Sequence, residues 1–556
     1  MNRETELHFA QLPEIDIPRS KFKIPHNHKS TFSAGDLVPI YCTEVLPGDT
    51  ISLEMASVVR MMTPLYPTMD NASMDLCFFY VPARLLWDHW KAFWGENTNA
   101  WYQSVEYEVP QITTNSGSKF ASKSVADYMG LPVGVAGLSV SALPFRAYAK
   151  IWSDWWRDEN LQADAMNSTG DSNAVTSSYS YLGGNLLKVN KYHDYFSSCL
   201  PAPLKSGSSV ALPLGTWAPV QTRTNVTVPV TNDPTTGYNA ALTWNKVDNT
   251  NWGSQNTSYG ITVMTPVTTS KTATTKETSA STTSGSSGLY PSNLWADLSN
   301  ATAATITELR QAFAIQRFFE AQARGGSRYI EFLKNIFGVT SPDARLQRSE
   351  YLGGRRVPLN IFQSTQTSST DSTSPIGYTG GFSHTADSGD IFTKSFTEHG
   401  YIIGTACIRY EHSFNQGVER MWSRKKFTDF YVPQFAFLSE QPVYLKEIYA
   451  DGTTNDDTVF GYQEAWAGSY RWKPNIVTSE LRTTYAQTLD AWHYADHYTQ
   501  APVLGSTWIQ ENRSNIDRTL VVTSGESDQF VADFFFNPTF VRPMPLYSVP
   551  GLIDHF

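Results

Sequence analysis

Strand-length hydrophobic patterns lie near both ends of this chain. Residues 51–59 (ISLEMASVV) alternate apolar and polar side chains, which predicts a half-buried strand. Residues 36–45 (DLVPIYCTEV) precede them across the turn LPGD, and we interpret the two segments as an antiparallel hairpin. The continuous apolar run DLCFFYVP (75–82) predicts a buried strand that ends at its proline. Further strands are predicted in YIIGTACIRYEHS (401–413), FAFL (435–438), VFGYQ (459–463) and DQFVADFFF (528–536).

Helical spacing of large apolar residues marks the segments in between. The first helix runs through Leu86, Trp90, Phe93 and Trp94 and stops at Gly95. Pro144 opens a second helix, whose aromatic residues share one face: Phe145, Tyr148, Trp152, Trp155 and Trp156. A capping box, Thr305 to Glu308, starts a third helix that closes at Gly325, and a fourth follows over 330–338. Aromatic stripes at this spacing usually belong to a core, so we assign them to packing.

These elements suggest one antiparallel β domain that carries long insertions. We divide the chain into an arm (1–35), first strands with a helical insertion (36–205), a Ser/Thr-rich surface insertion (206–300), a helical and loop segment (301–400), and the remaining strands with a C-terminal tail (401–556). Between Gln221 and Tyr290, 27 of 70 residues are Ser or Thr, too polar for a large core. A surface insertion with some β structure is our interpretation, and a disordered linker is the alternative.

Composition limits the classes of function. With 41% hydrophobic and 17% charged residues the chain is globular, and 13% aromatic residues suit thick cores and large contact surfaces. The net charge of -10 excludes nucleic-acid binding through overall basicity, but not through a local patch. Four separated cysteines signal neither disulfides nor a thiolate metal site. We expect no signal peptide and no membrane span, and folding in a reducing cytoplasm.

Local basic clusters are more informative than the overall charge. No acidic residue occurs from Ile17 to Gly35, while Arg19, Lys21, Lys23 and Lys29 are basic. This stretch is either a solvated tail or an arm lying on phosphates or a neighbouring subunit. Two more clusters carry Arg near aromatic residues, a pattern that suits single-stranded nucleic acid or intersubunit ion pairing: SPDARLQRSEYLGGRR (341–356) and ERMWSRKKF (419–427).

Enzyme motifs are absent from the sequence. We find no Walker loop, dinucleotide fingerprint, nucleophile elbow or zincin motif, so we predict no catalytic residue and no cofactor. His493 and His497 are four residues apart, but no third ligand is evident, and a hydrogen-bonded structural pair is the better interpretation than a metal site. Nothing singles out two carboxylates as a glycosidase pair.

Several long segments resemble the major capsid protein of small single-stranded DNA phages, the Microviridae, of the gokushovirus type. The resemblance rests on ordered blocks that run along the whole chain: RSKFKIPHNHKSTFSAGDLVPIYCTEVLPGDT (19–50), VVRMMTPLYPTMDNASMD (58–75), FFYVPARLLWDHWKAFWGEN (78–97), QRFFEAQARGGSRYIEFLKNIFGVTSPDARLQRSEYLGG (316–354), SFTEHGYIIG (395–404), QGVERMWSR (416–424), FGYQEAW (460–466), LDAWHYADHY (489–498) and RPMPLYSVPGLIDHF (542–556). Residues 206–300 and 365–390 show no such likeness.

The resemblance implies a mainly β fold, a single eight-stranded antiparallel jelly roll with long insertions, that assembles into a small T=1 icosahedral shell around a circular single-stranded DNA genome. It also implies an internal scaffolding protein, a DNA pilot protein and a host cell-surface receptor as partners, the last met by residues 206–300. We expect a virion protein, assembled in the bacterial cytoplasm. Our DNA-contact candidates are Arg19, Lys21, Lys23, Lys29, Arg355 and Arg356, and our intersubunit-contact candidates are Arg420, Trp422 and Arg424.

Two other functions stay open at this stage. A carbohydrate-binding or glycan-cleaving jelly roll would use Trp and Tyr faces to stack on sugars. A single-stranded-DNA-binding protein would bind DNA as free subunits in a salt-dependent manner. Only the capsid interpretation predicts closed, uniform shells.

Overall fold

The computed structural model describes most of the chain. The described residues are 18–96, 107–166, 168–205, 220–222, 230–232, 289–291, 294–296, 306–325, 334–335, 347–368, 370, 372, 375–522 and 525–547. The chain divides into two compact units, one formed by Met1–Ser208 with Phe318–Phe556 and one formed by Ser209–Arg317. Each unit is described by itself.

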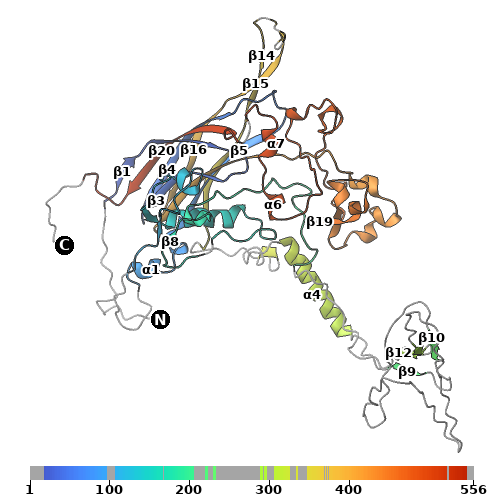
Figure 1. Ribbon diagram of the computed structural model, residues 1–556. Coiled ribbons are helices and arrows are strands. Elements are labelled where there is room, and N and C mark those ends of the chain that lie inside the picture. The colour runs from blue at the N-terminus through green and yellow to red at the C-terminus, as the bar shows by residue number, and fades with distance from the viewer. Residues whose placement is uncertain are drawn as a thin grey trace, which may run out of the picture. The chain divides into compact units, whose positions relative to one another are not determined.

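The larger unit is built on two antiparallel sheets (Figure 1). The first sheet has the order β1/β2, β20, β4, β16, and its strands are β1 Ser20–Lys23, β2 His26–Phe32, β20 Phe530–Arg542, β4 Thr50–Met61 and β16 Thr385–Ser395. The second sheet has the order β13, β5, β17, β3, and its strands are β13 Glu350–Pro358, β5 Ala72–Pro82, β17 Gly400–Tyr410 and β3 Val38–Val45. The mainly β, antiparallel fold with long insertions that the sequence predicted is confirmed.

Strands β1 and β2 act as one strand of the first sheet. Both pair with β20 in one continuous register, from Ser20 opposite Arg542 to Phe32 opposite Phe530. Pro25 interrupts the pairing because proline has no backbone N–H to donate. Ranked along the chain, the two sheets therefore read 1-8-3-6 and 2-7-4-5.

Burial explains why the strands differ in sequence. Strand β4 alternates buried and exposed residues because only one of its faces meets the core between the sheets. Strands β5 and β17 are buried on nearly every residue, since their second face packs beneath helix α3 (Leu143–Ile151). Phe79 and Ile403 lie on that second face, whereas Phe78 and Ile402 point into the sandwich.

Long connections between the strands carry short elements. Those between β5 and β13 in the larger unit are η2 Ala83–Leu85, α1 Trp90–Phe93, β6 Gln111–Thr113, α2 Val125–Tyr128, β7 Ser139–Ser141, α3, the π-helical turn η3 Trp152–Trp156, β8 Ala174–Val175 and η4 Ser180–Leu182. Those between β17 and β20 are η5 Arg420–Ser423, η6 Phe427–Asp429, η7 Pro433–Phe435, β18 Gln441–Tyr444, η8 Leu445–Glu447, η9 Thr454–Asp457, β19 Val459–Gln463, η10 Ser479–Leu481, η11 Asp490–Trp492, α6 Ser506–Ile509 and α7 Ser514–Asp517.

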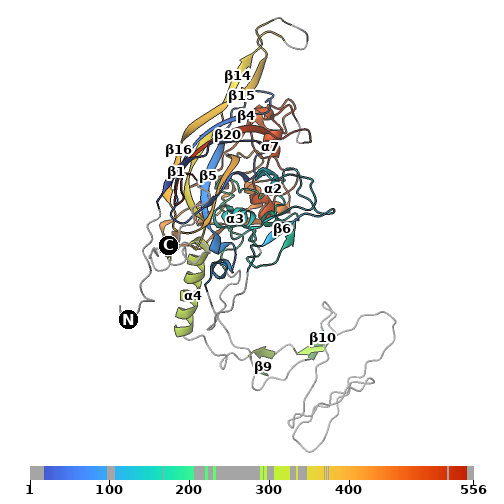
Figure 2. The same cartoon turned by 90° about the vertical axis from the view of Figure 1, so that its left-hand side faces the viewer.

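A further connection forms a hairpin that projects from one end of the sandwich (Figures 1 and 2). Its strands are β14 (Ile361–Thr365) and β15 (Thr379–Ser383). The exposed rings of Phe362 and Phe382 stack on each other across the pair, with centroids 5.3 Å apart.

The helix predictions are confirmed to different extents. Phe145, Tyr148 and Trp152 of the predicted aromatic stripe are buried in the core, but Trp155 is exposed and Trp156 is only partly buried, because α3 ends at Ile151 and the π-helical turn η3 follows. The first predicted helix is only the single turn α1. Helix α4 (Ile306–Gly325) has the bounds that its capping box and glycine predicted. The fourth predicted helix, over 330–338, lies outside the described residues apart from 334–335.

Two strand predictions are wrong. Strands β3 and β4 do not form a hairpin, because β3 pairs with β17 while β4 pairs with β20 and β16 in the other sheet. The short link between them, with Gly48 at φ 89°, carries the chain from one sheet to the other. The segment FAFL is not a strand either, since it covers the end of η7 and an exposed loop.

The structure also differs from the arm expected over residues 1–35. Ser20–Lys23 and His26–Phe32 are strands of the first sheet, and Phe32 is buried in the core. The sequence of these two strands is polar because their lysine side chains lie on the outer face of the sheet.

The smaller unit is described only in short pieces. Strand β9 (Val220–Thr222) pairs with β12 (Leu294–Ala296), and β10 (Val230–Asn232) pairs with β11 (Leu289–Pro291). The rest of the Ser/Thr-rich segment lies outside the described residues, so its function as a surface insertion stays a prediction. Among the helices that the structure describes, none combines the length and apolar character needed to cross a membrane.

Candidate subunit and nucleic-acid contact surfaces

Three of the predicted DNA-contact lysines share one face of the edge strand β1/β2. Lys21, Lys23 and Lys29 alternate with inward-facing residues, so all three point away from the sandwich and are exposed. Lys29 lies opposite Asp533 on β20, with 3.7 Å between its Nζ and the carboxylate Oδ2. Arg19 is exposed just before β1. The structure therefore brings these candidates together on the first sheet.

The other two DNA-contact candidates do not join them. Neighbouring residues of a strand point to opposite faces, which separates Arg355 from Arg356 on β13. Arg355 reaches β16, where its Nη2 lies 2.9 Å from Oδ1 of Asp387. Arg356 instead donates from Nε to Oδ1 of Asp75 at 2.6 Å and stacks over the ring of Tyr192.

Asp75 is the centre of a buried ionic cluster. It accepts hydrogen bonds from the guanidinium groups of Arg356 and Arg409 and from the hydroxyl of Tyr192. Burial raises the pKa of the Asp75 carboxyl, but hydrogen bonds and charges from both arginines outweigh burial and hold the pKa below its ordinary value. Arg356 therefore neutralises a buried carboxylate within its own subunit.

The three intersubunit-contact candidates lie in one loop, Val418–Leu438, which we name the aromatic loop. Arg420 donates to the carbonyl of Pro442 (2.7 Å) and to Oε1 of Glu447 (3.2 Å). Arg424 stacks on the ring of Tyr470, 4.0 Å from its centroid, and donates to the carbonyl of Gly468. These two arginines fix the loop from beneath, so they anchor it to its own subunit.

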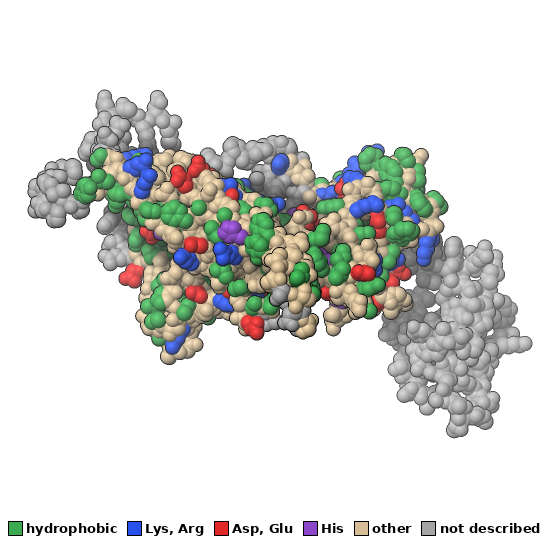
Figure 3. Space-filling view, turned by 90° about the horizontal axis from the view of Figure 1, so that it is seen from above, with side chains coloured by type: hydrophobic (Ala, Val, Ile, Leu, Met, Phe, Trp, Pro, Cys, Tyr) green, Lys and Arg blue, Asp and Glu red, His purple; other side chains and the backbone are tan. Residues whose placement is uncertain are grey.

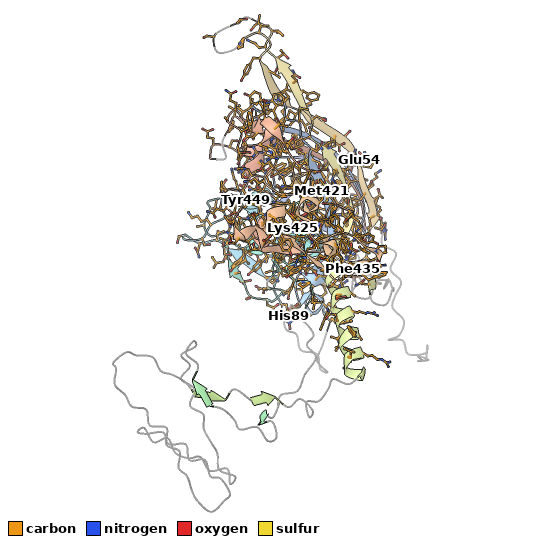
Figure 4. All side chains as sticks on the ribbon, turned by 90° about the vertical axis from the view of Figure 1, so that its right-hand side faces the viewer. Glu54, His89, Met421, Lys425, Phe435 and Tyr449 are labelled. Carbon is orange, nitrogen blue, oxygen red and sulfur yellow. The ribbon has the colours of Figure 1, made fainter. Side chains whose placement is uncertain are left out.

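Trp422 differs from its arginine neighbours because it points into solvent. Its exposed fraction is 74%, that of Phe427 is 77% and that of Phe437 is 100%. Hydrophobic and basic side chains lie together at the right-hand end of the larger unit in Figure 3, and Met421 and Lys425 of the loop are labelled in Figure 4. Asp429 accepts from the backbone N–H groups of Lys425 and Lys426, which holds this exposed turn in one conformation.

A second buried network ties the insertions to strand β17. His412 follows β17, and its Nδ1 lies 3.0 Å from Asp496 while its Nε2 lies 3.1 Å from Glu511. Lys191 adds a third contact, 3.3 Å from Asp496. Burial lowers the pKa of His412, but the two carboxylates outweigh burial and raise the pKa to about 10. The imidazole is therefore a permanent cation at neutral pH.

The histidine pair considered as a metal site is not on a helix. Residues 493–497 are extended, Nε2 of His493 lies 2.7 Å from the carbonyl of Leu481, and the backbone N–H of Ala495 donates to its Nδ1. Across the described part of the chain, no three His, Cys, Asp or Glu side chains are grouped to hold a metal ion.

Sequence reasoning missed the two ionic networks. Asp75 opens an apolar strand, and a carboxylate in such a run was a usable signal for a buried ion pair. Lys191 and Asp496 gave no comparable signal, because 305 residues separate them along the chain.

These features define a class of protein: an antiparallel β-sandwich with long insertions, which presents Trp, Phe and Lys side chains on a fixed loop suited to macromolecular contact. Comparison with known proteins identifies the family. A model of the capsid protein (F protein) family matches residues 10–552. The chain is 42% identical to the capsid protein VP1 of Spiroplasma virus 4 over 98% of this chain and 97% of that one.

Two other capsid proteins named VP1 are similarly close. That of Bdellovibrio phage phiMH2K is 40% identical over 100% of this chain and 99% of its own, and that of Chlamydia phage 1 is 38% identical over 98% and 97%. The chain therefore belongs to the phage capsid protein (F protein) family. The resemblance to gokushovirus-type major capsid proteins and the structural function that it implied are confirmed.

Proposed function

We propose that this capsid subunit assembles with copies of itself into a small T=1 icosahedral shell that encloses a circular single-stranded DNA genome. The aromatic loop carries the self-assembly, since it exposes large aromatic side chains, most of all Trp422, Phe427 and Phe437, on a backbone already fixed by Arg420 and Arg424. A preorganised surface loses little conformational entropy when it is buried. The strand order 1-8-3-6 and 2-7-4-5 supports the jelly-roll form of the sandwich.

In this proposal the residues of the aromatic loop have two functions. Trp422, Phe427 and Phe437 are the side chains that a second copy buries, because aromatic residues dominate the energy of protein interfaces. Arg420 and Arg424 position the loop through contacts within the subunit.

The remaining partners follow from the family. We infer that an internal scaffolding protein and a DNA pilot protein act during assembly in the bacterial cytoplasm, and that residues 206–300 meet the host receptor. The work of the chain is association without covalent chemistry, and it needs no cofactor.

The lysines of the edge strand supply the genome contact. Replacing Arg19, Lys21, Lys23 and Lys29 together with Gln is expected to lower the DNA content of the particles more than the yield of shells. The reason is that these exposed cations meet phosphates, while their strand pairing and Phe32 keep the fold. The ratio of DNA to protein in purified particles measures the effect.

The control replaces two exposed cations of the aromatic loop, Lys425 and Lys426, with Gln. This variant is expected to keep a normal DNA content in whatever shells form. Normal DNA content in shells of the edge-strand variant would contradict the genome contact.

A further inference from the structure

The hairpin of β14 (Ile361–Thr365) and β15 (Thr379–Ser383) forms a sheet of only two strands. In the described part of the chain no third strand pairs with either of them. The hairpin projects from one end of the sandwich (Figures 1 and 2). An isolated two-stranded hairpin is marginally stable in water, and the unpaired backbone N–H and C=O groups at its edge are a template for another strand.

Of the two strands, β14 is the one that is open to a partner. Gly381 and Ser383 of β15 are buried. A Cβ atom at Gly381 would lie 2.8 Å from Cγ of Pro64, so a neighbouring segment lies directly against β15. By contrast, the four residues Phe362–Thr365 of β14 are all exposed.

Strand β14 lacks the charges that normally protect an edge. Its sequence is IFQST, and Asp371 is the one charged residue of the sequence from Ile361 to Ser383. The edge strands of the two main sheets all carry charged side chains: Lys21, Lys23 and Lys29 on β1/β2, Asp387, Asp390 and Lys394 on β16, Glu350, Arg355 and Arg356 on β13, and Glu44 on β3. Charges on an edge discourage the addition of a further strand, so β14 differs from these edges in permitting it.

An uncharged strand suits pairing with a copy of itself. Two identical antiparallel strands are related by a two-fold axis, and a residue on that axis faces its own copy. A charged residue there would meet a like charge, whereas the amide of Gln363, the middle residue of β14, both donates to and accepts from its copy. The family identifies the chain as a capsid subunit, so a second copy is the partner that it has to meet.

We propose that β14 pairs with β14 of a second copy, antiparallel and centred on Gln363, so that two hairpins form one four-stranded sheet across a two-fold axis. In this register Phe362 lies diagonally from its own copy, a distance that aromatic rings reach. The stacked rings of Phe362 and Phe382 in the two subunits then form one aromatic surface. This inference rests on the proposed self-assembly and assigns it a second contact in addition to the aromatic loop.

Disulfide cross-linking within assembled particles tests the pairing. Gln363→Cys is expected to give a covalent dimer of the chain on mild oxidation, because directly opposite strand residues have Cα atoms about 4.5–5.5 Å apart. Thr379→Cys is the matched control on the same hairpin. It lies on β15, which the proposal places three strand spacings, about 14 Å, from its copy, too far for a disulfide.

A non-reducing gel measures the yield of dimer, and the unaltered chain with its four native cysteines gives the background. A yield from Gln363→Cys no higher than that from Thr379→Cys would overturn the proposal. A disulfide from residue 363 to a different protein would also overturn it.

A pair of opposite charges at residue 363 gives a second test, which does not depend on oxidation. Gln363→Lys and Gln363→Glu, expressed separately, are each expected to lower the yield of closed shells by about tenfold or more, because like charges face each other at every two-fold axis. The exposed position of Gln363 keeps both variants folded. Expression of the two variants together is expected to restore the yield, since Lys then faces Glu.

Normal shells from either charged variant alone, or no recovery on joint expression, would contradict the contact. The unaltered chain separates the two levels of the account. Closed shells from the unaltered chain without a dimer at residue 363 reject the β14 contact and leave the proposed function intact. Absence of shells from the unaltered chain rejects both.

Discussion

Replacing Asp496 with Asn is expected to lower the free energy of unfolding by about 3–5 kcal/mol. The carboxylate faces His412 and Lys191 in the buried network, and removal of its charge leaves two cations near each other with only Glu511 to balance them. Burial raises the pKa of Asp496, but His412 and Lys191 outweigh burial and hold it below its ordinary value, which shows how strongly the site favours the charged form. Urea unfolding of the unassembled chain measures the loss.

Asp457→Asn is the matched control for this prediction. Asp457 pairs with Lys446 at 2.6 Å, but its side chain is exposed, and exposed pairs contribute little to stability. A loss for Asp496→Asn no larger than the loss for Asp457→Asn would show that the buried network does not hold the insertions to β17.

Replacing Trp422, Phe427 and Phe437 together with Ser is expected to abolish shell formation. Truncation of a central aromatic residue in an interface typically costs about 2 kcal/mol or more, and every subunit of a closed shell repeats the defect. The three side chains are exposed in the subunit, so its own stability is expected to stay unchanged. Analytical ultracentrifugation of the expressed protein distinguishes shells from free subunits.

The control variant replaces each of the three residues with another aromatic residue. Trp422→Phe, Phe427→Tyr and Phe437→Tyr keep large flat side chains at the same positions, and this variant is expected to form shells. Normal shells from the serine variant would contradict the contact function of the aromatic loop.

The sequence predicted elements of the fold correctly where burial of one face sets the pattern of apolar and polar residues. The alternation of β4 and the continuous apolar run of β5 indicated which residues are buried, and the capping box of α4 indicated where the helix begins. Pairing was not predictable, because alternation states which face is buried but does not identify the neighbouring strand. The β3–β4 hairpin was wrong for this reason, and β2 was missed because its partner β20 lies about 500 residues away.

The sequence identified which residue types could make contacts, but it did not show what each of these residues contacts in the structure. Arg355 and Arg356 are adjacent in sequence, yet the strand sends them to Asp387 and Asp75 on different sides. The apolar residues of FAFL suggested a strand, whereas the structure places them in a loop in which Phe437 is completely exposed. Arg60 and Lys29 lie on the same sheet because their strands, β4 and β2, both pair with β20, which the sequence alone did not reveal.

Electron microscopy of the purified full-length chain, expressed with its genome, tests the central claim most directly. The account predicts closed, uniform icosahedral particles of one size that contain single-stranded DNA. Free subunits, or small oligomers of mixed size, would contradict it.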